Sequence, residues 1–488
     1  MPDILEPPPK SGKLNLSRIL DKFGANEGSS EDVFYYWGLF RNTPRDRFAV
    51  IKISGECIET SLDALAEDIS DIFHLGLIPV VTHGWGKSLT ERLKVDGIPS
   101  QFVEGERYTD RKVMKYVEDI ARENLGALVD ALKKRGVFAK PLRARDRVII
   151  AEDKHESGYG KNNGNIVEIN TAPIFSAIER GYVPVISPIV ASKIGRKHFN
   201  LNSASVGAEL ARAIDPVKYL MVTGLGGVFN DPETRTQLIR ELVLRREYEQ
   251  MVSSGVLSKG MKKNVDEAMQ CLEARANGED RSVQIVGAGN LLHELFSRKG
   301  AGTYIRLGYD ITTEPMELFD RSKIEGLVAK VFGSSLKPSF FEETGKQVHL
   351  EPNYKGIAIV IENPIASDSP EADLIDYIDI VAVNPGFERN GLGGDLINSV
   401  LGLQPKKEEA STTQNGGKRR NGHRVKVFWR SKTYREDVND WYYRISDGHW
   451  QYQGKEKSPY NLFWIGLTRD EVGKALAYVR NRPSNFEI

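Results

Sequence analysis

Short apolar runs alternate with amphipathic stretches along residues 47–307. The runs are continuous rather than alternating, which is typical of parallel strands covered on both faces of a sheet. They predict strands at residues 48–53, 78–82, 148–151, 183–188, 219–223 and 283–286. The stretches between them predict helices at residues 62–75, 111–135, 172–180, 203–214 and 263–276. This alternation predicts an α/β sandwich with a mostly parallel sheet.

Residues 1–46 precede this domain and follow a different pattern. Residues 1–13 are rich in proline and predict a disordered tail, whereas 14–23 and 32–41 carry helical periodicity. In the second helix an apolar stripe, Val33, Tyr36, Trp37 and Phe40, falls at i, i+3, i+4 and i+7. The stripe needs burial, either on its own domain or against a partner subunit, and the pattern leaves both open.

The rest of the chain predicts a linker at 308–322 and a second domain at 323–488 of α+β character. Within that domain, residues 376–400 predict a buried strand, a loop of small residues and then a helix. Residues 404–424 are polar and low in complexity, which favours a flexible surface insertion.

Composition excludes several functions. Of the 488 residues, 67 are Lys or Arg and 67 are Asp or Glu, so neither a nucleic-acid nor a membrane-surface partner is indicated. Only Cys57 and Cys271 occur, which fits a reducing compartment. No run is long enough to span a bilayer, and the N-terminus lacks the apolar core of a signal peptide. We therefore expect a cytoplasmic protein.

The loop within 376–400 has the features of an anion-binding turn. Gly391, Gly393 and Gly394 have no side chains, so a ligand can approach their main-chain N–H groups. The following helix would direct its free amides and the positive end of its dipole at the same point.

A second cluster further along identifies the domain. Residues 428–432 read Phe-Trp-Arg-Ser-Lys, and 439–442 read Asn-Asp-Trp-Tyr. In this order after the glycine loop, they resemble the GNAT acetyltransferase domain of N-acetylglutamate synthases. The resemblance implies acetyl-CoA as co-substrate and glutamate as acceptor. It implies a CoA-binding set of Val383, Arg389, Asn390, Gly391, Leu392, Gly393 and Gly394.

The same resemblance assigns the chemistry. Tyr442 matches the general acid that protonates the CoA sulfur, and Arg430 offers a planar fork for a substrate carboxylate. Two positions depart from the family. Ile380 replaces a lysine that contacts that carboxylate, and the asparagine between arginine and tyrosine is absent. Arg435 lies in that stretch and could restore the charge.

The first domain resembles the amino-acid kinase family, specifically acetylglutamate kinases. Small residues follow the ends of the first predicted strands, which is where α/β sheets bind phosphate. Further motifs come after them in the same order as in the family. The positions matched are Lys52, Gly55, Gly84, Gly86, Arg107 and Asn200.

Four charge-bearing or close-approach positions differ from that family. Trp85 replaces a glycine, Ala204 and Gly224 replace aspartates, and the second catalytic lysine is displaced, with Lys263 one residue away. Because phosphoryl transfer depends on preorganised charge, we expect a catalytically inactive kinase domain with a regulatory or assembly role, and no metal.

Residues 293–296 and 300–303 match the region that binds the arginine effector in the family. Lys299 stands there in place of an acidic residue and would repel a guanidinium group. An arginine effector is therefore a weaker implication of the resemblance, and its sign is open. The family also implies a homo-tetramer or hexamer.

Together these features predict an N-acetylglutamate synthase at the acetylated entry to arginine biosynthesis. Three alternatives stay open: a bifunctional synthase/kinase, a non-catalytic regulatory subunit, and an acetyltransferase for another amino acid.

Overall fold

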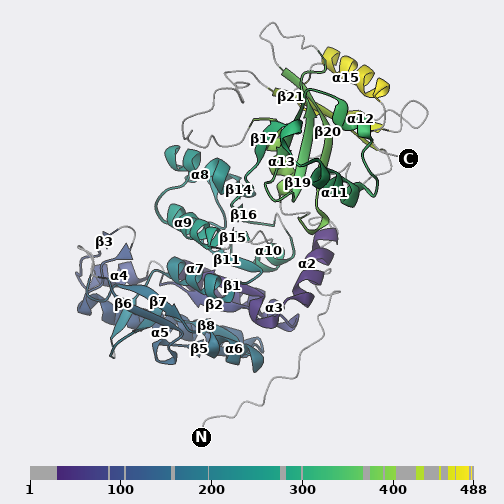
Figure 1. Cartoon of the computed structure of the whole chain (residues 1–488). Helices are drawn as coiled ribbons and strands as arrows, with labels where there is room; N and C mark the ends of the chain where they lie inside the picture. Colours follow the sequence, from purple (N-terminus) through teal and green to yellow (C-terminus); the bar gives the residue numbers. More distant parts are fainter. Residues whose placement is uncertain are drawn as a thin grey trace. The chain divides into compact units, whose positions relative to one another are not determined.

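The structure is a computed structural model of the chain (Figure 1). It describes residues 30–85, 88–103, 106–154, 160–195, 197–274, 282–297, 300–365, 374–387, 391–402, 425–432, 450–451, 460–465, 467, 469–482 and 485. The chain divides into two compact units, Met1–Leu307 and Gly308–Ile488. The predicted tail 1–13, the helix at 14–23 and the insertion 404–424 lie outside the described residues.

The first unit is built on an eight-stranded sheet in the order β14-β16-β15-β11-β1-β2-β8-β5. All neighbours are parallel except β15 and β16. The strands are β14 (Glu241–Val243), β16 (Thr303–Arg306), β15 (Ser282–Val286), β11 (Lys218–Val222), β1 (Ala49–Ile53), β2 (Val80–His83), β8 (Val183–Ile186) and β5 (Ala139–Leu142). Every residue of the central strands β1, β2, β11 and β15 is buried, as their continuous apolar runs predict.

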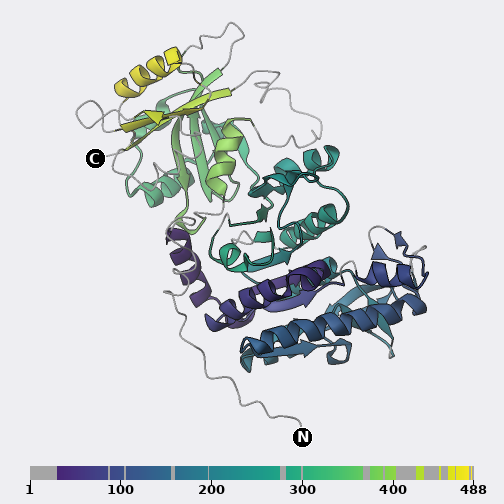
Figure 2. The same cartoon turned by 180° about the vertical axis from the view of Figure 1, so that it is seen from behind.

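Helices cover both faces of this sheet. In Figure 1 α7 and α9 pack together over one face, and Figure 2 shows α3 and α5 side by side over the other. The helices of the unit are α2 (Ser30–Asn42), α3 (Gly55–His74), α4 (Ser88–Val95), α5 (Arg111–Lys134), α6 (Ala172–Glu179), α7 (Ser203–Ile214), α8 (Leu244–Ser253), α9 (Lys259–Glu273) and α10 (Leu291–Phe296). The predicted α/β sandwich with a mostly parallel sheet is confirmed.

Smaller sheets complete the unit. A four-stranded sheet has the order β10-β9-β6-β7, and β3-β4 and β12-β13 are two-stranded hairpins. These strands are β10 (His198–Asn200), β9 (Ile189–Ser192), β6 (Ile149–Asp153), β7 (Gly164–Ile169), β3 (Phe102–Val103), β4 (Glu106–Arg107), β12 (Phe229–Asp231) and β13 (Thr236–Leu238).

Helix α3 begins seven residues before the predicted start at 62. Ser54 caps it by accepting a hydrogen bond from the main-chain N–H of Cys57, which satisfies an amide that a helix start leaves without a partner. The cap places the start of α3 directly after β1.

The apolar stripe of α2 packs on its own unit. Val33, Tyr36 and Phe40 are buried in its core, and the Phe40 ring centroid lies 4.9 Å from that of Phe48. Of the two interpretations that the pattern left open, packing on its own domain holds for these three residues.

The second unit contains one seven-stranded sheet in the order β17-β18-β19-β20-β21-β23-β22. Neighbouring strands are antiparallel except β20 and β21. The strands are β17 (Thr312–Pro315), β18 (Lys346–Leu350), β19 (Gly356–Ile361), β20 (Leu374–Val383), β21 (Val425–Lys432), β23 (Tyr460–Ile465) and β22 (Trp450–Gln451). The helices are α11 (Arg321–Phe332), α12 (Pro338–Glu342), α13 (Leu392–Val400) and α15 (Arg469–Asn481).

The stretch predicted as a linker, 308–322, needs correction. Its residues Thr312–Pro315 form the edge strand β17, which pairs with β18, and α11 starts at Arg321. All four residues of β17 are exposed, so the strand lacks the apolar positions by which a sequence pattern identifies a strand.

Candidate active sites

The sheet of the second unit separates between β20 and β21. The two parallel strands pair from Leu374 with Val425 to Ile378 with Trp429. β20 then continues to Val383 and β21 to Lys432, each still paired with its outer neighbour. Over the described residues of both strands, no pairing joins them beyond Ile378, so the main-chain groups on the two facing edges are not used by the sheet.

A β-bulge marks the point of separation. On β19, Ile359 pairs with Ile380 and Val360 pairs with Ile378, so Asp379 is an extra residue on β20. The bulge also resets the alternation of side chains. Ile378 packs in the core with α13, whereas Ile380, two residues later, packs in the core with α11.

Helix α13 begins at the end of the separated part of β20. Gly391 is its N-cap, with φ 87°, a left-handed conformation that favours glycine. The first bond within the helix runs from Asp395 N to Gly391 O, at 3.0 Å. The amides of Leu392, Gly393 and Gly394 precede it and have no acceptor inside the helix. A Cβ on Gly394 would meet nothing within 4 Å, so a phosphate can approach this turn.

The predicted CoA-binding residues that are described lie together here. Val383 ends β20, Gly391 caps α13, and Leu392 is buried against β19 while its amide stays at the helix start. The apolar side of α13 packs on Ala358, Val360 and Ile378, which fixes the helix start. Arg389 and Asn390 lie outside the described residues.

The predicted catalytic and substrate residues are only partly described. Arg430 lies on β21 one residue beyond its last pair with β20, but its side chain is not described. Tyr442 and Arg435 lie outside the described residues. Ile380 is buried among Ile324, Leu327 and other apolar residues, so its side chain belongs to the core.

In the first unit, Lys52, Gly55 and Gly84 lie at the carboxyl ends of β1 and β2. The Gly84 amide donates to Ile53 O at 2.9 Å. A Cβ on Gly84 would lie 2.9 Å from Ser203 Oγ and 3.3 Å from Gly55 N, so the close approach requires glycine. Burial lowers the pKa of Lys52 from 10.5 to about 8, although Cys57 and Glu267 oppose the shift. Gly86 lies outside the described residues.

Arg107 and Asn200 form a second group. Asn163 Nδ2 donates to Arg107 O at 2.9 Å, and Asn200 Nδ2 donates to Thr109 Oγ1 at 2.9 Å. The Arg107 guanidinium donates to Ser100 and Thr90 and lies 4.6 Å from the Phe102 ring centroid. Arg107 is therefore held by its own hairpin, by Ser100 just before it and by Thr90 on α4.

Two further observations concern metal binding and membrane insertion. Among the described residues, no group of three or more His, Cys, Asp or Glu could hold a metal ion. In that same part of the chain, no helix combines the length and hydrophobicity needed to span a membrane.

Residues 47–287 match the model of the amino acid kinase family. The acetylglutamate kinase of Alkaliphilus metalliredigens is 32% identical over 270 residues, covering 54% of this chain and 84% of that protein. The chain belongs to the acetylglutamate kinase family. The acetylglutamate kinase of Xanthomonas campestris pv. campestris is 27% identical over 457 residues, covering 93% of this chain and 98% of that protein.

Solved structures extend the similarity to both units. N-acetylglutamate synthase from Neisseria gonorrhoeae, complexed with coenzyme A and N-acetyl-glutamate, has a TM-score of 0.59 and 19% identity, covering 92% of this chain and 96% of that one. Its complex with coenzyme A and L-arginine has a TM-score of 0.52. The fold is therefore that of the synthase/kinase family members in which an amino-acid kinase unit is fused to a GNAT unit.

This chain has Ala204 and Gly224 at two positions where the resemblance to acetylglutamate kinases implies aspartate. A carboxylate from another part of the chain lies near each of these positions. Ser205 Oγ donates to Glu267 Oε1 at 2.5 Å, and the Glu267 charge acts on Lys52. A Cβ on Gly224 would lie 2.9 Å from Glu56 Cδ. Sequence reasoning missed both acids. Glu267 could have been found because it lies four residues after Lys263, on the same side of α9.

The displaced lysine of the acetylglutamate kinase motif is held by a carboxylate. Lys263 Nζ lies 3.7 Å from Glu106 Oε1 on the β3–β4 hairpin, and Lys154 Nζ lies 3.3 Å from Glu106 Oε2. Both lysines are largely buried. An incoming phosphate would compete with Glu106 for them.

The region that matches the family effector site holds a buried acid. Glu294 is fully buried on α10, and burial raises its pKa, opposed by the Gly302 amide and Lys218. Lys218 Nζ donates to the Glu294 and Ser297 carbonyls at 3.3 Å and lies 4.0 Å from the Tyr36 ring centroid. Lys299 lies outside the described residues.

Proposed function

We propose that this chain is an acetyl-CoA:L-glutamate N-acetyltransferase, an N-acetylglutamate synthase. The observation that carries the proposal is the separation of β20 from β21, with the free amides of α13 at the end of β20. The amides suit the CoA pyrophosphate, and the separated strand edges offer main-chain partners to the rest of the cofactor.

The reaction needs a neutral amine, donors for the oxyanion and a proton for the leaving sulfur. The glutamate nitrogen attacks the thioester carbonyl carbon, the C–N bond forms, and the C–S bond breaks. The attacking nitrogen gives up its surplus proton to water, because no histidine or carboxylate stands out in the sequence as a base. We assign the proton on the departing thiolate to Tyr442, and we assign the recognition of a substrate carboxylate to Arg430 and Arg435.

The test is CoA release by the full chain with acetyl-CoA and a panel of amino acids. Release with glutamate that falls at least about 100-fold in Tyr442→Phe supports the proposal, since a general acid contributes roughly 10²–10⁴-fold. Release with another amino acid assigns a different acceptor. No release by a folded chain that binds CoA favours a regulatory subunit.

A second candidate is a bifunctional synthase/kinase. It is favoured by Glu267 and Glu56, which lie near the positions where Ala204 and Gly224 lack the family aspartates, and by relatives named acetylglutamate kinase. The engagement of Lys263 by Glu106 weighs against it, and we therefore propose an inactive kinase unit.

ADP formation decides between these two. The full chain is incubated with ATP, Mg²⁺ and N-acetylglutamate, and Lys52→Met serves as the control. Lys52-dependent ADP formation establishes the kinase, whereas its absence in a protein active for CoA release establishes the synthase alone.

We further propose a cytoplasmic setting, a homo-tetramer or hexamer, and an arginine effector. Light scattering of the purified chain, with and without arginine, tests the last two together.

A further inference from the structure

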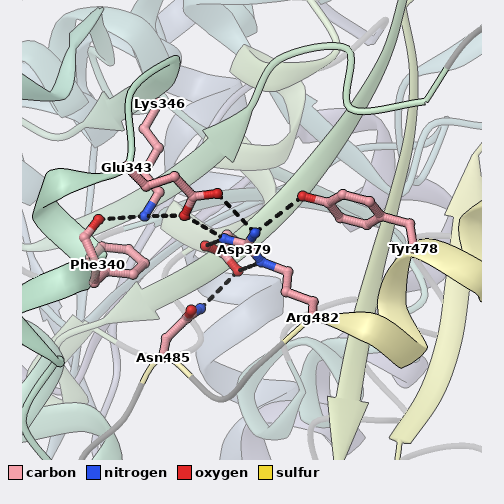
Figure 3. Close-up of polar contacts among 7 residues, drawn as sticks. All are labelled: Phe340, Glu343, Lys346, Asp379, Tyr478, Arg482 and Asn485. Atoms are coloured by element: carbon pink, nitrogen blue, oxygen red, sulfur yellow. Dashed lines mark hydrogen bonds and ion pairs between the residues drawn. The ribbon is translucent and has the colours of Figure 1, made fainter.

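The C-terminal helix of the second unit is joined to the bulge of β20 by one arginine. Arg482 follows α15, and its guanidinium contacts Asp379 at two points, Nη2 to Oδ2 at 2.7 Å and Nε to Oδ1 at 3.2 Å. It also contacts both oxygens of Glu343, each at 2.9 Å. Figure 3 shows the guanidinium between the two carboxylates.

Further contacts close this network, which we call the Arg482 clasp. Lys346 Nζ donates to Glu343 at 2.9 Å and to Phe340 O at 2.5 Å, and Asn485 Nδ2 donates to Asp379 Oδ1 at 2.8 Å. The clasp contains two cations and two carboxylates, so its charges balance. Burial opposes the charged form of Arg482, but the contacts to Glu343 and Asp379 outweigh it and raise its pKa.

The clasp buries the side chain of Asp379 but leaves part of the residue exposed. The Asp379 side chain is 0% exposed, yet the residue as a whole is partly exposed. Solvent therefore reaches its main chain. Because Asp379 is the bulged residue and pairing with β21 ends at Ile378, the accessible main chain lies where the two strands separate.

The two carboxylates of the clasp differ in one respect that matters. Asp379 belongs to β20, the strand that leads to Val383 and α13. Glu343 follows α12 and lies outside the seven strands of the sheet. Both bind the same guanidinium, but only Asp379 couples it to the strand that carries the proposed CoA site.

We propose that Arg482 is a positioning residue for the acyl-CoA site, which it fixes by holding the bulged residue Asp379. This inference rests on the proposed acetyltransferase function. Held by its side chain, Asp379 keeps the bulge at one register, so β20 leaves β21 after Ile378 and delivers Val383 and the amides of α13 in one geometry. Loss of the contact would let the extra residue shift along β20 and misplace that segment.

The experiment compares two near-isosteric variants of the full chain, Asp379→Asn and Glu343→Gln. Each removes one carboxylate charge from the same arginine. Calorimetry gives the dissociation constant for CoA, thermal unfolding gives the melting temperature, and steady-state kinetics give kcat and the KM values for acetyl-CoA and glutamate.

We expect both variants to lower the melting temperature, but only Asp379→Asn to weaken CoA binding, by about tenfold, with a matching rise in the KM for acetyl-CoA. Arg482→Lys keeps the charge but loses the planar fork and should fall between wild type and Asp379→Asn. Arg321→Met, which breaks the exposed ion pair with Glu325 on α11, should leave CoA binding unchanged.

Unchanged CoA binding in Asp379→Asn would overturn the inference, because the clasp would then serve stability alone. Equal weakening in Glu343→Gln would also overturn it, since the effect would not act through β20. A wild-type chain that binds no CoA would instead remove the proposed function, and this inference with it.

Discussion

The carboxylate of Glu56 occupies the space beside Gly224. A Cβ on Gly224 would lie 2.9 Å from Glu56 Cδ and 3.0 Å from its Oε2. Glu56 is on the first turn of α3 and Gly224 follows β11. The negative charge at this sheet edge is therefore contributed by α3, although the acetylglutamate kinase family carries it after the later strand.

Placing an aspartate at Gly224 should bring two carboxylates together. We expect Gly224→Asp to destabilise the first unit by about 1–2 kcal/mol at pH 7, because like charges in one site disfavour ionisation of both. Glu56→Gln in the same chain should restore at least half of that loss. Urea unfolding of both single variants and the double variant gives the coupling energy, and additive effects would show that the two positions do not interact.

The stability of the first unit should rise with pH through the titration of Lys52. Its pKa is lowered from 10.5 to about 8 by burial, so between these values the unfolded chain binds the extra proton and alkalinity favours the fold. At about 1.36 kcal/mol per unit, the rise is at most about 3 kcal/mol. Denaturant unfolding from pH 7.5 to 10 measures it.

Lys52→Met should lack this rise and should match or exceed wild-type stability at pH 7.5. The same slope in wild type and variant would mean that Lys52 is not the group responsible.

Acid should loosen the second unit through Glu343. Hydrogen bonding from Arg482, reinforced by Lys346 and opposed by partial burial, lowers the pKa of Glu343 from 4.5 to about 2. Its contribution is complete above about pH 4.5 and is lost as the pH falls toward 2. Near-UV circular dichroism during acid titration should show Glu343→Gln to be less pH-dependent than wild type in that interval.

Gly356→Ala should disturb the start of α13. A Cβ on Gly356 would lie 2.7 Å from Leu392 Cδ2 and 3.0 Å from Leu392 Cγ, so the buried Leu392 side chain must shift against its neighbours at the helix start. We expect a loss of about 1–3 kcal/mol, as for other overpacked cores, together with weaker CoA binding.

Gly326→Ala is the matched control for this change, because Gly326 is on α11 and a Cβ there meets nothing within 4 Å. CoA binding that falls in neither variant would place the amides of α13 outside the cofactor site.

The sequence predicted the helices and strands whose buried residues recur at regular spacing along the chain. Strands β1, β11 and β15 and helices α5 and α7 were found within one residue or two, because each has an uninterrupted apolar run or a clear helical stripe. Exposed or very short strands were missed. β17 is wholly exposed, and β5, β14 and β16 have only three or four residues each, too short for periodicity to register.

The candidate sites divide in the same way. Gly391 and Lys52 could be found because glycine turns and strand-end lysines leave a local signature. Glu267 could have been found as well, because it lies four residues after Lys263 on α9. Glu56 and Asp379 could not, since Glu56 lies beside a residue far away in sequence and Asp379 acts through a change of register. The missing aspartates at 204 and 224 predicted a loss of charge that the fold partly replaces from α9 and α3.

The separation of β20 from β21 makes the proposed cofactor site largely a property of the backbone. An amino-acid substitution changes the side chain but keeps the main-chain N–H. The side chains around this turn can therefore be exchanged without removing the groups proposed to bind the cofactor. In the proposed enzyme, acceptor choice would depend on a different set of atoms, the side chains of β21 and the residues after it. An engineer could redirect which amine is acylated by altering that set and leave the acyl donor as it is.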